Sequence, residues 1–480
     1  MTGKLKHTAT VPGLALSLMP VGLLLCSMAL MIIIGGAGAV QDYSPWLLLG
    51  AGVAGAVASL VVCRCPFRRL WGGLLRSGRQ IVPSIPILLL IGTVSATWML
   101  SGVVPVLIDY GLKVLNPGLF LFTACAVCAV ISILTGSSWT TIATIGVALM
   151  GIGTVMGYST GWVAGAIISG AYFGDKMSPL SDTTVLASSS CGVELFAHIR
   201  YMMLTSAPAM VLALAVYAVV GLVGDHAAAG EFTDLTSRLA QTFNLTPWLM
   251  VVPAVTGVLI ALRVNSYVTL AVSSLLGLGA MFIFQPGVTA ALGGAGVATA
   301  AKVLAVSTSL STGSELLDSL VATGGMAGML PTVWLVTCAM TFGGVMIGSG
   351  MLASITGALS KRIRSPRATV GATVASGLAL NAYTGDQYLS IILSSNMFSP
   401  MYGRNALEGR LLSRTVEDSV SVTSVLIPWN SCGLTQATVL GVATLTYLPC
   451  CIFNIVSPLM SLFMAWAGIR IRRTAPVSGH

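Results

Sequence analysis

The sequence predicts an all-α polytopic membrane protein with two structurally repeated halves, broken helices or re-entrant hairpins, and about ten to thirteen membrane segments. Its mean hydropathy is +0.92. Hydrophobic residues make up 55% of the 480 residues and charged residues only 8%. Fourteen acidic and 23 basic residues are too few to solvate the surface of a soluble chain of this length. The alternating pattern of membrane β-strands is absent, so the spans are predicted to be helices.

Apolar runs place the membrane segments in order along the chain. In the first half they cover residues 11–34, 45–63, 81–100, 118–151, 157–190 and 198–223. In the second half they cover residues 246–262, 266–285, 293–310, 328–358, 368–398 and 419–467. Several runs are longer than the roughly 20 residues that one crossing needs, so we expect them to contain breaks or more than one segment. The first run exceeds the core of a signal peptide and is predicted to be a retained helix.

Basic residues gather in short segments beside the apolar runs. They are Lys4 and Lys6; Arg64, Arg68, Arg69, Arg76 and Arg79; Lys361, Arg362, Arg364 and Arg367; Arg404, Arg410 and Arg414; and Arg470, Arg472 and Arg473. Such clusters are typical of cytoplasmic loops and ends of membrane proteins. We therefore predict a multi-pass protein of the cytoplasmic (inner) membrane with both termini in the cytoplasm. The net charge of +9 then reflects contact with the lipid bilayer and indicates no nucleic-acid partner.

A polar connection divides the chain. Residues 224–245 contain three acidic residues and one basic residue, Arg238, and are predicted to lie outside the cytoplasm. They separate an N-terminal transmembrane half, residues 1–223, from a C-terminal transmembrane half, residues 246–480.

The two halves carry matching motifs in the same order. LTGSSWTTI (134–142) resembles YTGDQYLSI (383–391), and IGTVSATWMLSG (91–102) resembles FGGVMIGSGMLAS (342–354). The pattern Asp-x-x-Ser-x-x-Ser occurs at residues 175–181 and again at residues 418–424. Three matches at similar spacing predict an internal duplication. Secondary transporters are commonly built from such repeats, with the binding site where broken helices meet near the middle of the membrane.

Residues 171–184, AYFGDKMSPLSDTT, contain the charges Asp175, Lys176 and Asp182. One charge at the centre of a bilayer costs roughly 3 kcal/mol on the insertion scale, so intramembrane charges are functional candidates. Gly174 and Pro179 interrupt the same stretch and free backbone groups that could bind an ion. A carboxylate held out of water can exchange a proton for a cation near neutral pH.

The candidate site consists of carboxylates and neutral oxygen ligands near the repeated breaks. The carboxylates predicted to bind Na⁺ or a proton are Asp175, Asp182, Asp386, Glu417 and Asp418. The supporting ligands are Thr135, Ser137, Ser138, Ser178, Ser181, Thr183, Thr184, Ser421, Ser424 and Asn430. Alternatively, a carboxylate pairs with a basic residue or caps a broken helix, and a hydroxyl forms an interhelical hydrogen bond. Lys176 is predicted to be either a counter-ion for an Asp or a contact for an anionic substrate.

No other motif in the sequence indicates an enzymatic activity. The sequence lacks GxxxxGK[ST] and HExxH, and no cofactor is expected. The ten cysteines form no metal-ligand pattern and are interpreted as packing residues. His198, Glu315 and Asp318 are expected to lie at span boundaries or interfaces.

These motifs resemble those of the NhaC family of Na⁺/H⁺ antiporters. The resemblance is carried by GAYFGDKMSPLSDTT (170–184), TGSSW (135–139), LLDSLVATGGM (316–326), NAYTGDQYLSIIL (381–393) and LSRTVEDSVSVTSVLIPWNSCG (412–433). It implies secondary exchange of Na⁺ against H⁺, and some relatives exchange malate for lactate. The resemblance also implies the fold of the larger ion-transporter superfamily, which contains inverted repeats with membrane-embedded hairpins. The sequence departs from the family pattern at Val185, at Val420, Ser421 and Val425, and at Ser394-Ser395-Asn396.

The functional prediction is a secondary antiporter in which Na⁺ and H⁺ compete for the carboxylates. The alternative is a cation-coupled exchanger of organic anions or amino acids on the same fold, with Lys176 and helix N-termini meeting a carboxylate substrate. A channel would need a pore-forming repeat motif, which is absent, and a scaffold would leave the buried charges unexplained. The expected partners are Na⁺, H⁺, small organic anions, the bilayer and a second copy of the chain.

Overall fold

The computed structural model describes residues 12–82, 84–114, 116–179, 181–224, 232–262, 264–310, 318, 321–360, 365–469 and 471. Within these ranges the chain is almost entirely helical, and β-pairing is limited to an isolated antiparallel bridge between Thr308 and Thr323. The predicted all-α class is confirmed. The predictions made for Lys4, Lys6, Glu315, Lys361, Arg362, Arg364, Arg470, Arg472 and Arg473 fall outside the described residues.

The helices follow the predicted apolar runs closely. The first half contains α1 (Leu14–Val61), α2 (Phe67–Ile81), α3 (Ser84–Leu100), α4 (Val103–Val114), α5 (Phe120–Thr135), α6 (Ser138–Thr141), α7 (Val147–Val155), α8 (Thr160–Met177), α9 (Asp182–Ser190) and α10 (Leu195–Val223). A π-helical turn, η2 (Ile142–Gly146), joins α6 to α7. In the polar connection, residues Phe232–Thr242 form helix α11.

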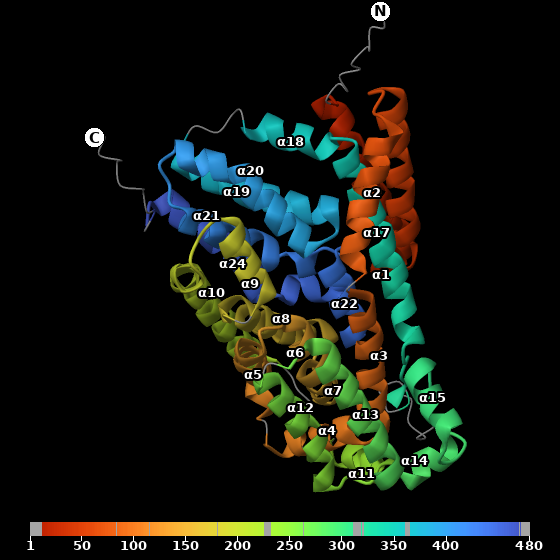
Figure 1. Ribbon diagram of the computed structural model, residues 1–480. Coiled ribbons are helices and arrows are strands. Elements are labelled where there is room, and N and C mark those ends of the chain that lie inside the picture. Colours follow the sequence, from red (N-terminus) through yellow and green to blue (C-terminus); the bar gives the residue numbers. More distant parts are fainter. Residues whose placement is uncertain are drawn as a thin grey trace, which may run out of the picture.

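The second half is divided into more pieces. It contains α12 (Val251–Ala261), α13 (Ser266–Phe284), α14 (Pro286–Ala291), α15 (Val297–Ala305), α17 (Leu330–Gly348), α18 (Met351–Ser360), α19 (Pro366–Thr384), α20 (Gln387–Arg404), α21 (Gly409–Val416), α22 (Ser431–Leu440), α23 (Thr444–Tyr447) and α24 (Ile452–Ala467). A second π-helical turn, η5 (Glu417–Ser421), continues α21. In Figure 1, α8, α9 and α22 lie at the centre of the molecule, while α11, α14 and α15 lie at one end and α18 and α20 at the other.

Within the described chain, seven helices are long and apolar enough to cross a membrane, or nine when each of two bent pairs counts as one span. The bends are 66° between α3 and α4 and 56° between residues Thr444–Cys450 and α24. Broken helices are therefore present, as predicted. The predicted ten to thirteen segments also include helices such as α8 and α20, whose polar residues lower their hydropathy.

Helix α1 contains two apolar windows, Leu14–Met31 and Tyr43–Val61. The ring of Pro20 lies against Gly55, which shows that the two ends of α1 run beside each other. Large apolar side chains such as Val57 and Val61 are exposed on it. An exposed apolar surface of this kind is suited to lipid contact.

Two sequence expectations need correction. The run 293–310 forms only the nine-residue helix α15, which is too short to span a membrane. The chain turns before it at Gly293 and Gly294, both with positive φ, and after it enters the bridge at Thr308. The basic segment from Arg64 to Arg79 is largely helical, because α2 packs against α17 where Gly73 meets the backbone of Gly344 and Gly348.

The TG motifs fold in the same way in both halves. Helices α5 and α19 each end at a glycine with φ of +65°, Gly136 and Gly385. In each case the next residue caps a new helix: Ser137 accepts from Thr140 N at 3.2 Å, and Asp386 accepts from Leu389 N at 2.8 Å. Glycine is needed at these turns because a Cβ disfavours the left-handed region.

The bends upstream also match. Ser101-Gly102 follows α3, and Ser349-Gly350 follows α17; the glycines have φ of +82° and +80°. The hydroxyl of Ser101 accepts from Val103 N at 3.4 Å, and that of Ser349 accepts from Met351 N at 3.3 Å. The backbone therefore pairs Gly102 with Gly350, whereas the comparison of motifs 91–102 and 342–354 by their first residues pairs Gly92 with Gly343. Duplication of the whole halves stays a prediction.

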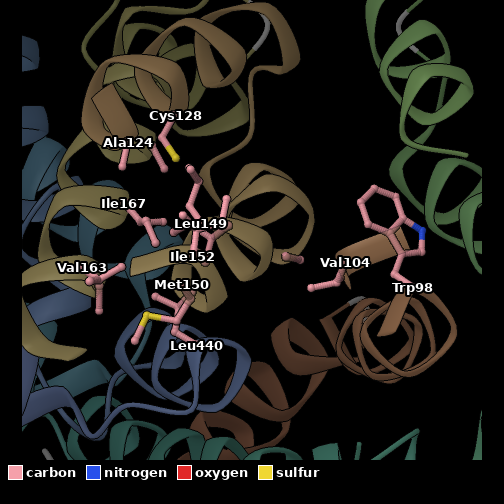
Figure 2. Close-up of a cluster of buried hydrophobic side chains, with 14 of the residues drawn as sticks. Trp98, Val104, Ala124, Cys128, Leu149, Met150, Ile152, Val163, Ile167 and Leu440 are labelled. Atoms are coloured by element: carbon pink, nitrogen blue, oxygen red, sulfur yellow. The ribbon is translucent and has the colours of Figure 1, made fainter. Parts of the chain in front are cut away.

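A continuous apolar cluster surrounds the centre of the molecule. Figure 2 shows Leu149 and Ile152 of α7 beside Cys128 of α5 and Ile167 of α8. All four side chains are at most 6% exposed. This packing fixes α5, α7 and α8 relative to one another, and α5 and α8 carry polar residues at their ends.

Candidate ion-binding site

Close packing of α5 against α8 positions the first carboxylate. A Cβ at Gly174 would collide with the backbone of α5 at Ala129 and Ile133. The hydroxyl of Ser132 on α5 donates to the carbonyl of Ala171 on α8 at 2.6 Å. Small residues allow such contacts between membrane helices. Because Gly174 precedes Asp175, the contact places Asp175 beside the break between α5 and α6.

Asp175 is buried near the end of α8. Ser138 Oγ at the start of α6 donates to Asp175 Oδ2 at 2.7 Å. Asp175 Oδ1 accepts no hydrogen bond from a described residue. One carboxylate oxygen is thus fixed, and the other is available to a proton or a cation.

Asp182 begins α9 after the interruption that follows α8. Its Oδ1 accepts from Thr183 N at 2.8 Å, and its Oδ2 accepts from the Tyr388 hydroxyl of α20 at 2.7 Å. Asp182 is exposed, and Tyr388 is 38% exposed. The second carboxylate therefore joins the two halves and lies nearer the surface than Asp175.

Asp175 and Asp182 line one cavity of about 260 Å³. Its remaining lining comes from α3, the α5–α6 break, α9, α13 and α20. The lining residues are Ile87, Ile91, Thr135, Gly136, Ser137, Trp139, Thr140, Asp175, Asp182, Thr183, Leu270, Gln387 and Tyr388. No basic residue is among these described lining residues. The cavity thus combines carboxylates and hydroxyls with an acidic charge, which suits a cation.

Lys176 points to a different cluster. It forms a fully buried ion pair with Asp418 and donates to Ser457 Oγ at 3.2 Å. Asp418 also accepts hydrogen bonds from Thr205, Ser457 and Ser461. Asp418 is therefore surrounded by partners and does not line the acidic cavity.

Arg414 is buried, although the sequence analysis grouped it with the basic residues of loops, and His198 is buried near the start of α10, at the expected span boundary. Arg414 Nε lies 3.9 Å from Asp418 Oδ2, and its guanidinium group lies 4.8 Å from the ring centre of Tyr201. His198 Nδ1 lies 2.8 Å from Ser413 Oγ. The i,i+4 spacing of Arg414 and Asp418 is the sequence signal for this pair.

Glu417 is adjacent to Asp418 yet differs from it in its contacts. It is fully buried, and neither carboxylate oxygen accepts a hydrogen bond from a described residue. The Ser421 hydroxyl lies near enough to interact with Glu417, but it too has no partner in hydrogen-bond geometry.

Asp386 and Asn430 cap helices. Asp386 caps α20, as described above, and its backbone N–H donates to Thr384 Oγ1 at 3.1 Å. Asn430 Oδ1 accepts from Cys432 N at 3.1 Å at the start of α22, and its amide donates to Asn381 O at 3.1 Å. Neither residue lines the acidic cavity.

The other predicted ligands take local contacts. Two pairs of hydroxyls are close: Thr135 Oγ1 lies 3.3 Å from Thr141 Oγ1, and Ser181 Oγ lies 2.9 Å from Thr183 Oγ1. Two hydroxyls donate to backbone carbonyls: Thr184 Oγ1 to Lys176 O at 3.2 Å, and Ser424 Oγ to Ser421 O at 2.8 Å. The backbone N–H of Ser178 donates to Asp175 O at 3.1 Å. These contacts hold the ends of the broken helices in place.

The sequence analysis did not select Trp139, Gln387 or Tyr388, which line the cavity. All three lie within the TG motifs matched between the halves, two or three residues after the turn glycine. The cluster around Asp418 also contains Thr205, Ser457 and Ser461, which lie on α10 and α24. No motif marks these three hydroxyls.

Comparison with known proteins identifies the family. The sequence profile of the Na⁺/H⁺ antiporter family matches residues 170–469. The Na⁺/H⁺ antiporter NhaC of Alkalihalophilus pseudofirmus is 36% identical over 81% of this chain and 83% of its own length. The malate-2H⁺/Na⁺-lactate antiporter of Bacillus subtilis is 34% identical over 80% of this chain and 81% of its own length. The arginine/ornithine antiporter ArcD of Halobacterium salinarum is 33% identical over 97% of this chain and 94% of its own length. The chain therefore belongs to the Na⁺/H⁺ antiporter family, as its resemblance to NhaC predicted.

Proposed function

We propose that the protein is a secondary antiporter that exchanges Na⁺ for H⁺ across the cytoplasmic membrane. The observation that carries the proposal is the cavity of about 260 Å³ lined by Asp175 and Asp182 and by no basic residue. Intramembrane carboxylates beside a cavity are costly unless they serve an ion or proton pathway. Membership of the Na⁺/H⁺ antiporter family supports the same activity.

Cation binding in this proposal centres on Asp175. Its Oδ2 is oriented by Ser138, and its Oδ1 has no described hydrogen-bond donor. Na⁺ at the cavity would therefore meet one oriented carboxylate, the second carboxylate of Asp182 and the hydroxyl oxygens of the α5–α6 break. Na⁺ binding is coupled to the release of a proton from a carboxyl group of the protein, so the two ions move in opposite directions. Transmembrane gradients then supply the energy, at about 2.3 kcal/mol per charge and 100 mV.

The proposed organisation follows the predicted halves, residues 1–223 and 246–480, with residues 224–245 outside the cytoplasm. The proposal puts both termini in the cytoplasm, and the basic clusters near them support this orientation. In Figure 1, α11 of the connection lies at the opposite end of the molecule from α18 and α20. Assembly into a homo-oligomer remains part of this proposal.

A second candidate is the exchange of an organic substrate together with the cation. The cavity of about 260 Å³ is much larger than a dehydrated Na⁺ requires. For comparison, one water molecule occupies about 10–15 Å³ when volume is measured in this way. Related proteins are named as malate/lactate and arginine/ornithine antiporters. Within this candidate the acidic lining favours an amino acid bound through its ammonium group. An organic anion is less favoured, because Lys176 is paired with Asp418.

The test uses purified protein in liposomes with lumenal pH recorded after addition of Na⁺, Li⁺, K⁺, malate, lactate, arginine or ornithine. Proton movement with Na⁺ alone supports the first candidate, and movement only with an organic substrate supports the second. Asp175→Asn and Asp182→Asn should abolish or strongly reduce Na⁺-driven proton movement, because each removes a carboxylate from the cavity.

The matched control is Asp386→Asn. Asn caps a helix about as well as Asp, so this variant should retain exchange. Normal exchange in both Asp175→Asn and Asp182→Asn would refute the site assignment.

A further inference from the structure

Glu417 stands apart from the other buried carboxylates in its lack of partners. Asp175 accepts from Ser138, Asp386 caps α20, and Asp418 pairs with Lys176. Glu417 is 0% exposed, and both of its oxygens are unpartnered among the described residues. It lies outside the lining of the acidic cavity.

The charged groups around Glu417 do not neutralise it in this arrangement. From α8, Lys176 attracts it and Asp175 repels it; from its own turn, Asp418 repels it; and Cys191, after α9, interacts with it as well. Lys176 is already paired with Asp418, and Arg414 also lies toward Asp418. His198 of α10 interacts with the Lys176–Asp418 pair.

An ionised carboxylate in such a place would be very unfavourable, because a buried charge needs a pair or several hydrogen bonds. A neutral carboxyl group avoids this cost. We propose that Glu417 is the proton-carrying carboxyl of the exchanger, distinct from the cation site at Asp175 and Asp182, and that the structure shows its proton-loaded state. The inference rests on the proposed antiport function.

The local structure couples the protonation state of Glu417 to the rest of the protein. Glu417 and Asp418 begin the π-helical turn η5, and π-helical turns are frequent at functional sites. When the transport cycle brings water to Glu417, its O–H bond breaks, the proton passes to that water and the bonding electrons stay on the carboxylate. The new anion then competes with the adjacent Asp418 for Lys176. Since Lys176 follows Asp175 directly on α8, a change in that pairing reaches the cation site.

The test compares Glu417→Gln, Glu417→Asp and the control Glu408→Gln in proteoliposomes. Glu408 is a carboxylate of the same type, paired with Arg410 in a partly exposed position. Glu417→Gln imitates the neutral form but cannot release a proton. It should retain exchange of radioactive Na⁺ for unlabelled Na⁺ and lose Na⁺-driven proton movement, while Glu408→Gln should retain both.

A second readout is independent of transport. The infrared carbonyl stretch of a protonated carboxyl group should be present in the wild type at neutral pH and should be missing from Glu417→Gln. Wild-type protein without Na⁺-driven proton movement would refute the proposed function. If the wild type is active, a Glu417→Gln variant with normal proton movement, or with neither activity while folded, overturns the role of Glu417.

If Glu417→Gln does not fold, Glu417→Asp decides. It should retain the carboxyl band and show a shifted pH profile of exchange. An unchanged pH profile of exchange, or loss of the carboxyl band from the folded variant, overturns the proposal.

Discussion

At the scale of single residues, the ion pair of Lys176 and Asp418 links the two halves through fully buried side chains. Both side chains are at most 1% exposed, and they come from α8 and from the turn after α21. The sequence analysis left Lys176 open between counter-ion and substrate contact. In the structure Lys176 is paired with Asp418 and does not line the acidic cavity. We therefore expect substitution of Lys176 to lower the stability of the protein.

We predict that Lys176→Met and Asp418→Leu each destabilise the protein by about 3–5 kcal/mol, because each removes one partner of a fully buried ion pair. The double variant should cost less than either single variant. Thermal unfolding in detergent, followed by intrinsic fluorescence, measures the order of the four Tm values.

The control is the pair Arg410–Glu408, which is partly exposed. Exposed ion pairs contribute about 0–1 kcal/mol to stability, so we expect its loss to have a small effect. If Lys176→Met lowers Tm no more than Arg410→Met does, the ion pair has no structural importance.

The sequence marks candidate site residues where charges interrupt apolar sequence, and their role in ion binding stays a prediction. Asp175 and Asp182 were selected because a charge in a membrane needs a reason, and both line the cavity. Tyr388 was not selected, since a Tyr in an apolar helix is common and its hydroxyl contact with Asp182 crosses 206 positions of sequence. Arg414 was placed in a loop because sequence periodicity does not show which basic residues fold inward.

At the scale of the elements, the breaks decide where the ligands lie. Gly136 and Gly385 end long helices in the left-handed region, so that the next helix starts at once in a new direction. These turns place Ser137 and Thr135 at the cavity from one half and Gln387 and Tyr388 from the other.

We predict that Gly385→Ala lowers Tm, because a left-handed conformation costs a residue with a Cβ about 1–2 kcal/mol. The added Cβ would also lie 2.9 Å from Ala339 Cβ. Na⁺-driven exchange should fall with it, since α20 would shift relative to α9. Thermal unfolding and the liposome assay measure both effects.

Gly371→Ala is the matched control on the same helix, α19. A Cβ there would meet only Leu462 at 4.0 Å, and its φ is not positive. Its Tm should equal or exceed that of the wild type. An equal loss of Tm in both variants would show that the turn geometry is unimportant.

At the scale of the whole molecule, the proposed topology puts the connection 224–245 and the end of α20 on opposite sides of the membrane. Gln241 in α11 and Arg404 at the end of α20 are both exposed. A Cys at position 241 should react with a membrane-impermeant maleimide in intact cells, whereas a Cys at position 404 should react only after permeabilisation.

The parent chain supplies the background for this labelling, since its Cys26 is exposed. Labelling of position 404 in intact cells, with protection of position 241, would reverse the proposed orientation. Labelling of both from one side would contradict the separation of the two ends.

The sequence by itself determined the class, the order of the helices and the positions of the main breaks. Hydropathy and chain length dictate helices in a membrane, and Gly, Ser and Asp clusters mark where those helices end. The carboxylates could be found because their cost in an apolar chain is independent of the fold.

Only the tertiary structure decided how these carboxylates divide. Asp175 and Asp182 line a cavity, Asp386 caps a helix, Asp418 is paired, and Glu417 is left without a partner. In sequence all five are acids near broken helices. Their different environments arise from partners on distant helices, such as Ser138, Tyr388 and Lys176, whose positions depend on packing between the two halves.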